Sequence, residues 1–122
     1  MTGEMDKRTA KHITLPNGMK CILISDPDST VSAASMQVKV GSFMDPEGFR
    51  GTAVYLQNML TKGSKKYPKV EENEDFFTKN NGDINSFTNW TCSNYHFKIQ
   101  HKAFEEGMDR FANMFIAPTF PD

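Results

Sequence analysis

The sequence predicts an α+β fold with a largely antiparallel sheet and helices packed on one face. Two observations support this prediction: segments with the alternating pattern of strands come in runs, and segments with helical spacing lie between and after those runs. The expected order is three strands, two helices, two strands and a last helix, which is typical of α+β domains. A chain of 122 residues is long enough for one domain with one core.

The first part of the chain is predicted to be a polar tail followed by strands. Residues 1–12 are polar and are expected to form the tail. A Pro-Asn-Gly turn signal at residues 16–18 separates the apolar runs 13–15 and 19–24. These runs should form a hairpin. A third strand is expected where apolar and polar residues alternate at 36–40.

Two helices are predicted in the middle of the chain. The first follows a glycine-containing loop at residues 41–51 and should end near Gly63. Its predicted apolar face has helical spacing and consists of Ala53, Leu56, Met59 and Leu60. The second is expected over residues 70–81, with acidic residues in its first turns and Gly82 as a left-handed C-cap.

The last part of the chain is predicted to contain two strands and a helix. Residues 83–100 should form the strands, joined by a turn at Ser93 and Asn94. The second of these strands has alternate apolar residues, which are Tyr95, Phe97 and Ile99. The last helix begins near Lys102 and ends before Pro118, and its apolar stripe consists of Phe104, Met108, Phe111, Ala112 and Phe115.

Composition and charge exclude two classes of partner. The formal net charge is -1, with 14 basic against 15 acidic residues, so the protein has no strong field for a polyanion, and nucleic acid is not expected as a partner. No apolar run approaches the roughly 18 residues of a membrane span, and residues 1–12 lack the apolar core of a secretory signal. We therefore expect no membrane partner and a cytoplasmic location.

The predicted first helix resembles the signature helix of the insulinase-like M16 zinc metallopeptidases of the insulysin and pitrilysin type. In that family small residues precede the motif H-x-x-E-H and Met-Leu follows it. Residues 51–64 have the same flanking residues. Further segments match in the same order along the chain: Leu15–Met19, Gly41-Ser42, Asp45-Pro46, Lys65–Lys69, Asn85–Thr88, Asn94-Tyr95 and Asp109–Ala112. The resemblance implies that residues 13–122 are the N-terminal portion of an M16 domain, about half of an M16-type α/β domain and truncated relative to a full-length protein.

The motif positions hold Val54, Gln57 and Asn58 in this sequence. In H-x-x-E-H the two histidines stand one helical turn apart and bind one zinc ion, and the glutamate is the general base beside the metal-bound water. Valine has no lone pair, an asparagine amide is a poor zinc donor, and glutamine cannot accept a proton near neutral pH. We therefore expect degenerate ligand positions at Val54 and Asn58, a degenerate general-base position at Gln57, no catalytic residue and no cofactor in this segment. The resemblance implies zinc in active members, with a third ligand that would fall beyond Asp122.

The resemblance also implies where a peptide would bind. Family members add an extended substrate to a sheet edge, and the matching segment is Asn85, Ser86, Phe87 and Thr88; for Phe87, plain core packing is an equally good interpretation. Backbone pairing needs no metal, so the leading hypothesis is a pseudo-peptidase that binds polypeptides or supports an assembly without cutting them. Its partners would be a peptide and either the remainder of its own chain or an M16 paralogue. Two alternatives remain: a non-catalytic domain or subunit of an active zinc metalloendopeptidase, and a purely structural interaction module.

A segment of this size should also expose apolar surface. The stripe of the last helix and the face of the sheet are expected to pack against the rest of a longer protein. We therefore expect the segment by itself to self-associate or to be only marginally stable.

Overall fold

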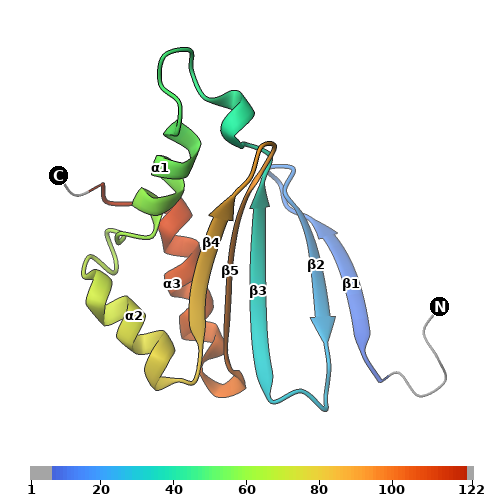
Figure 1. The fold of residues 1–122 in the computed structure, drawn as a ribbon. Helices are drawn as coiled ribbons and strands as arrows, with labels where there is room; N and C mark the ends of the chain where they lie inside the picture. The colour runs from blue at the N-terminus through green and yellow to red at the C-terminus, as the bar shows by residue number, and fades with distance from the viewer. Residues whose placement is uncertain (1–6, 121–122) are drawn as a thin grey trace. The chain divides into compact units, whose positions relative to one another are not determined.

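The computed structural model describes residues 7–120, which form an α+β fold with antiparallel sheets, as the sequence predicts (Figure 1). The chain divides into two units, one that ends at Thr30 and one that begins at Val31. The first unit contains strands β1 and β2, and the second contains the remaining strands and the helices. Within residues 7–120, no helix is both long enough and apolar enough to cross a membrane.

The first unit is the predicted hairpin. Strand β1 spans Thr9–Thr14 and pairs antiparallel with β2, which spans Lys20–Ser25. In the turn, Gly18 has a φ of 85° and its amide donates to the Leu15 carbonyl oxygen (2.8 Å). Glycine adopts this left-handed conformation without the steric cost that a side chain would bring.

The boundary expected for the N-terminal tail differs from the structure. We expected residues 1–12 to be a tail, but residues 9–12 belong to β1. Their sequence has no clear alternation, and they are extended because they pair with residues 22–25 of β2. Residues 1–6 of the expected tail lie outside the described residues.

The second unit contains a three-stranded antiparallel sheet in the order β3-β5-β4. Strand β3 spans Val31–Val38, β4 spans Asp83–Thr88 and β5 spans Ser93–Gln100. Because β5 lies between the other two, both of its edges are paired. Within the described chain, β4 pairs with β5 and with no other strand, so its outer edge is open.

The turn between β4 and β5 lies earlier than predicted. We expected it at Ser93 and Asn94, but Ser93 already pairs with Thr88 in the sheet. The Asn89 side-chain oxygen accepts hydrogen bonds from the amides of Thr91 and Cys92 (2.9 and 2.8 Å). Asparagine favours turns through such side-chain hydrogen bonds. The Asn89 amide also donates to the Cys92 carbonyl oxygen (2.9 Å), so the turn occupies residues 89–92.

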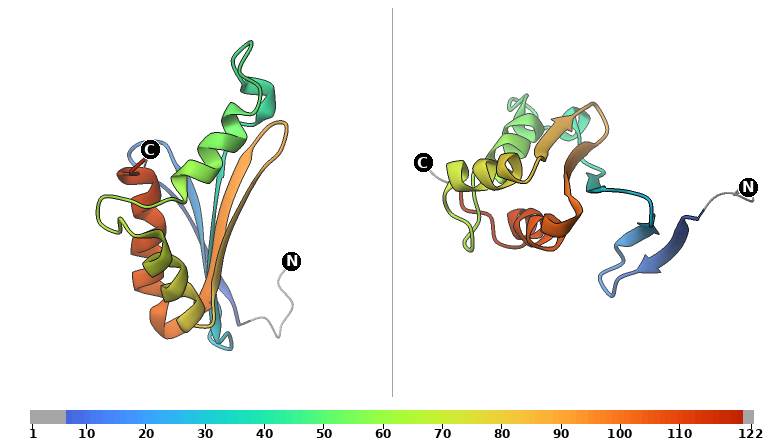
Figure 2. Two further views of the ribbon diagram at one scale, coloured as in Figure 1. Left: turned by 60° about the vertical axis from the view of Figure 1, so that its left-hand side comes forward. Right: turned by 90° about the horizontal axis from the view of Figure 1, so that it is seen from below.

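Three α-helices of the described chain cover one face of this sheet (Figure 2). Helix α1 spans Thr52–Leu60, α2 spans Val70–Lys79 and α3 spans Phe104–Ile116. Helices α1 and α2 contact β4, whereas α3 contacts β5 and β3. Two short 3-10 helices, η1 at Ser42–Met44 and η2 at His101–Ala103, precede α1 and α3.

The core lies between β5 and the helices. Tyr95, Phe97 and Ile99 are buried as predicted. The Phe97 ring contacts the Phe77 ring of α2 and the Phe111 ring of α3, with centroids 5.4 and 5.1 Å apart. Burial of such rings removes large apolar areas from water, and the ring contacts add a smaller directional contribution.

Two predicted core positions are instead exposed. Leu56 of α1 is 44% exposed, and Met108 of α3 is also exposed. Helix α1 meets the sheet through Ala53 and Gln57, four residues apart on one stripe. More than one stripe has helical spacing in these segments, and the packing partner selects which one is buried.

The end of α2 also differs from the prediction. We expected Gly82 to be the left-handed C-cap, but Asn81 has the positive φ, at 54°. Asparagine tolerates this conformation better than most residues. Gly82 is instead required by close packing, because a Cβ atom there would lie 2.2 Å from the Lys98 carbonyl oxygen of β5.

Candidate functional site

The start of α1 is held by a carboxylate from the preceding loop. Asp45 accepts hydrogen bonds from the amides of Gly51 and Ala53, at 2.7 and 2.8 Å. The first amides of a helix have no partner inside the helix, and a negative charge near them is favourable. This contact stabilises the start of α1.

The two predicted degenerate ligand positions lie on consecutive turns of α1. Val54 and Asn58 are both exposed. The Asn58 side-chain amide donates to the Val54 carbonyl oxygen at 3.0 Å, so its nitrogen is used within the helix. Neither side chain offers an imidazole or a carboxylate to a metal ion.

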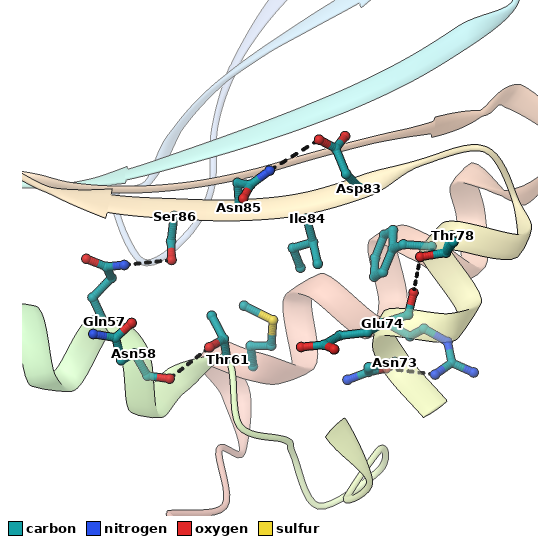
Figure 3. Close-up of a pocket in the computed structure, with 13 residues that line it drawn as sticks. Gln57, Asn58, Thr61, Asn73, Glu74, Thr78, Asp83, Ile84, Asn85 and Ser86 are labelled. Carbon is teal, nitrogen blue, oxygen red and sulfur yellow. Dashed lines mark hydrogen bonds between the residues drawn. The ribbon is translucent and has the colours of Figure 1, made fainter. Parts of the chain in front are cut away.

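Gln57, the predicted degenerate general-base position, faces the sheet and is only 8% exposed. Its side-chain nitrogen donates to the Ser86 hydroxyl oxygen of β4 at 2.8 Å (Figure 3). Ser86 belongs to the segment predicted to bind peptides. The structure therefore brings the predicted general-base position and the predicted edge strand into direct contact.

The predicted peptide-binding residues alternate across β4. Ser86 and Thr88 are partly buried on the helix side, whereas Asn85 and Phe87 are exposed on the other face. Phe87 is 49% exposed and does not belong to the core cluster, so the core-packing interpretation of this residue is wrong. All four residues belong to the strand with the open edge.

A pocket of about 470 Å³ lies between α1, α2 and β4. Ser86 and Ile84 point toward the helices that line it, whereas Asn85 and Asp83 point to the other side of the strand (Figure 3). Asn73 and Glu74 line the pocket from α2. Its wall carries amides and hydroxyls together with the Glu74 and Asp83 carboxylates and the Arg110 guanidinium, and no histidine or cysteine of the described chain lines it.

The described residues do not fit a zinc ion. Within residues 7–120, no group of three or more His, Cys, Asp or Glu side chains is placed to hold a metal. His96 has its Nδ1 atom 2.9 Å from the Asn94 side-chain oxygen, and His101 has its Nδ1 atom 2.9 Å from the Ser32 hydroxyl. Tetrahedral zinc sites need several such donors converging on one point.

Sequence reasoning assigned no role to a polar cluster that joins the α1–α2 connection to α3. Asp109 accepts hydrogen bonds from the Tyr67 hydroxyl and from the Lys66 ammonium, the latter at 2.6 Å. These two hydrogen bonds hold the pKa of the Asp109 carboxyl below its usual value, and the bond from Lys66 has the larger effect. The bond to Asp109 also raises the pKa of Tyr67 and of Lys66.

Arg110 extends this cluster to α2. Its guanidinium lies 4.3 Å from the centre of the Tyr67 ring and 4.4 Å from that of Phe76, and it donates to the Asn73 side-chain oxygen at 2.7 Å. Asp109 and Arg110 lie in one of the segments that carried the resemblance. Lys66 and Tyr67 lie in another such segment, Lys65–Lys69. The sequence does not show that the two segments are in contact.

Comparison with protein families identifies the class of this protein. A family model described as Insulinase (Peptidase family M16) matches residues 20–122. The chain therefore belongs to the insulinase family.

Two similar proteins are much longer than this chain. The chain is 45% identical over 113 residues to "Insulin-degrading enzyme-like 2" of Arabidopsis thaliana, covering 93% of this chain and 12% of that protein. It is 39% identical over 117 residues to "Insulin-degrading enzyme" of Homo sapiens, covering 96% of this chain and 12% of that protein. This chain thus spans about an eighth of the length of these relatives.

The fold is also found in solved structures. A crystal structure of pitrilysin matches with a TM-score of 0.88 and 33% sequence identity, over 94% of this chain and 12% of that chain. A protease from Helicobacter pylori matches with a TM-score of 0.83 at 21% identity, over 93% of this chain and 27% of that chain. The first likeness agrees with the family assignment, and the second concerns the fold alone.

Proposed function

We propose that this chain is a peptide-binding member of the insulinase family that does not cleave peptide bonds. The observation that carries the proposal is the contact of Gln57 with Ser86 on the open-edged strand β4. In this proposal Gln57 supports the strand instead of activating water. The edge strand pairs with an extended polypeptide.

Loss of hydrolysis is argued from the chemistry of three side chains. Val54 cannot ligate a metal, Asn58 uses its amide nitrogen on the Val54 carbonyl oxygen, and Gln57 has no carboxylate to take a proton from water. The described residues therefore do not fit a zinc ion. Zinc chemistry in this protein would require ligands from other residues.

Peptide binding is argued from the backbone of β4. On a strand that is paired on one side, the amides and carbonyls that point to the other side have no partner in the sheet. An extended peptide can pair with these groups whatever its side chains are. The name of the human relative describes an enzyme that degrades insulin, a polypeptide, which supports a polypeptide as the ligand.

A second candidate is a non-catalytic part of an active zinc metalloendopeptidase. The length of the relatives favours it, because this chain spans 12% of the proteins that it matches. In that case a partner segment or a paralogous subunit would supply the catalytic zinc. A purely structural module would differ from both candidates by binding no unfolded peptide.

The first test measures zinc and turnover on the same sample. The purified protein is washed with a chelator, its zinc content is measured by atomic emission, and a fluorogenic peptide is added. We expect neither bound zinc nor cleavage. Stoichiometric zinc with turnover would contradict the proposal, and replacement ligands would then be sought among His96, His101 and Cys92.

The second test asks whether binding uses the strand edge. Labelled peptides of about ten residues are N-methylated at one alternating set of backbone amides or at the other, because only alternate amides of an added strand face β4. One set should abolish binding, measured by fluorescence anisotropy, and the other should preserve it. Equal effects of the two sets would contradict edge pairing, and no binding of the unmodified peptide would favour the structural module.

A further inference from the structure

Two aromatic side chains lie exposed and in contact on two neighbouring turns. Phe43 belongs to η1, and Trp90 belongs to the turn between β4 and β5. Their ring centroids are 5.3 Å apart with an interplanar angle of 26°. Phe43 is nevertheless 74% exposed and Trp90 66% exposed, so the outer surface of this aromatic pair is in water.

The backbone beneath the aromatic pair is held in place. The Ser42 amide donates to the Asn89 carbonyl oxygen (3.0 Å), and the Phe43 amide donates to the Trp90 carbonyl oxygen (2.9 Å). A Cβ atom on Gly41 would lie 2.5 Å from the Asn89 carbonyl oxygen, so glycine permits this close approach. The two rings are therefore presented on a pre-organised backbone, which lowers the ordering cost of binding.

The position of Trp90 relates the aromatic pair to β4. Trp90 follows Thr88, the last residue of the strand, by two residues, so its Cα atom lies within about 7 Å of the end of the strand. A peptide paired along β4 therefore ends beside this turn. Residues 41–44 and 89–92 contain no charged side chain, so the surface offers apolar contact and no ion pair.

We infer that the Phe43–Trp90 pair is a subsite for an aromatic side chain of a polypeptide paired with β4. This inference rests on the proposed peptide binding. It adds a side-chain preference to a mode of binding that otherwise uses only the backbone of the peptide. Aromatic rings in contact contribute beyond the area that they bury, and an exposed pair accepts a third ring without rearrangement of the core.

The experiment moves one aromatic residue along a peptide. Labelled threonine- and serine-rich peptides of about ten residues carry a single phenylalanine at successive positions, and a reference peptide carries alanine instead. Anisotropy of the label measures affinity. Trp90 is the only tryptophan in the chain, so a change in its emission reports contact at the subsite itself.

We expect one register of phenylalanine to bind about tenfold more tightly than the alanine peptide and to change the Trp90 emission. Phe43→Ala should remove this preference for phenylalanine. The matched control Phe120→Ala removes another exposed aromatic ring, after α3, and should leave the preference unchanged.

The other outcomes separate the two proposals. Equal affinity for all peptides, or a preference that survives Phe43→Ala, would overturn the subsite and leave peptide binding on β4 in place. No binding of any peptide in the series would overturn both.

Discussion

Gln57, at the predicted degenerate general-base position, makes a structural contact in this fold. On α1 it is nearly buried, and its amide nitrogen donates to Ser86 rather than contacting solvent. A neutral amide can make this bond and remain buried, whereas an ionised carboxylate in the same place would incur a larger desolvation cost. At this position the chain therefore gains a structural link between a helix and the edge strand.

The Gln57–Ser86 hydrogen bond should contribute measurable stability. We expect Gln57→Leu to lower the free energy of unfolding by about 1 kcal/mol, because the bond is lost and the Ser86 hydroxyl is left partly buried. Urea denaturation of the two single variants and of Gln57→Leu with Ser86→Ala completes a double-mutant cycle. A coupling energy near zero would show that the bond does not stabilise the fold.

Asp109 is a second single residue with a defined physical effect. Hydrogen bonds from Lys66 and Tyr67 favour its ionised form and lower its pKa in the folded state. A group whose pKa is lower in the folded state contributes stability above its unfolded pKa, which is about 3.9 for aspartate. That contribution is lost as the pH falls through the lower folded value.

We therefore expect Asp109→Asn to be less stable than the original protein near neutral pH, with a difference that shrinks as the pH falls below about 4. Urea unfolding across this pH range measures the difference. Asp75→Asn controls for the loss of one surface carboxylate, because Asp75 pairs with Lys79 within α2. A difference that stays constant with pH would contradict the role of the charge.

At the scale of elements, the connection from α2 to β4 depends on two adjacent residues with different structural roles. Asn81 adopts a left-handed conformation, and the Gly82 amide donates to the Phe77 carbonyl oxygen at 2.8 Å. Gly82 also lies against the Lys98 backbone of β5. The first residue ends the helix, and the second lets the strand begin in contact with its neighbour.

Small substitutions at Asn81 and Gly82 should therefore have different effects on the free energy of unfolding. Asn81→Gly should be neutral or slightly stabilising, because glycine adopts a positive φ without a steric cost. Gly82→Ala should lower the free energy of unfolding by about 1 to 3 kcal/mol, because its Cβ would overlap a backbone carbonyl. Thermal or urea unfolding of both variants checks this, and a harmless Gly82→Ala would disprove the close-packing argument.

At the scale of the whole molecule, α1 carries more apolar surface than the sheet covers. Val54, Tyr55 and Leu56 are all exposed, while Ala53 and Gln57 face the sheet. In the last helix, by contrast, Phe111 is buried and Phe104 and Phe115 pack against the core, so most of the stripe that we expected to be uncovered is not. Exposed apolar side chains therefore remain on α1, whereas on α3 they are limited to residues outside the packed rings, such as Met108 and Ile116.

This surface should cause self-association of the chain by itself. Sedimentation velocity is expected to show oligomers that grow with concentration, and the melting temperature should rise with concentration. Leu56→Lys should reduce association while changing the stability of the fold by less than about 0.5 kcal/mol. A monomer with a sharp, concentration-independent melting transition would contradict the prediction.

The sequence by itself determined the fold class, the order of the elements and the family, and it predicts three degenerate positions on α1. These properties are local or depend on order along the chain: strand and helix periods repeat within a segment, and motifs match residue by residue. Where the local signal was ambiguous, prediction failed, as with the turn at residues 89–92 and the tail that became part of β1.

The tertiary structure alone decided which stripe of α1 is buried, that β4 has an open edge, and that Gln57 meets Ser86. The stacking of Phe43 on Trp90 is of the same kind, because 46 residues lie between the two in the sequence. A periodic pattern states which side chains share a face, but it does not state what that face contacts. The partner is selected by long-range packing, and the candidate site of this protein consists of such partners.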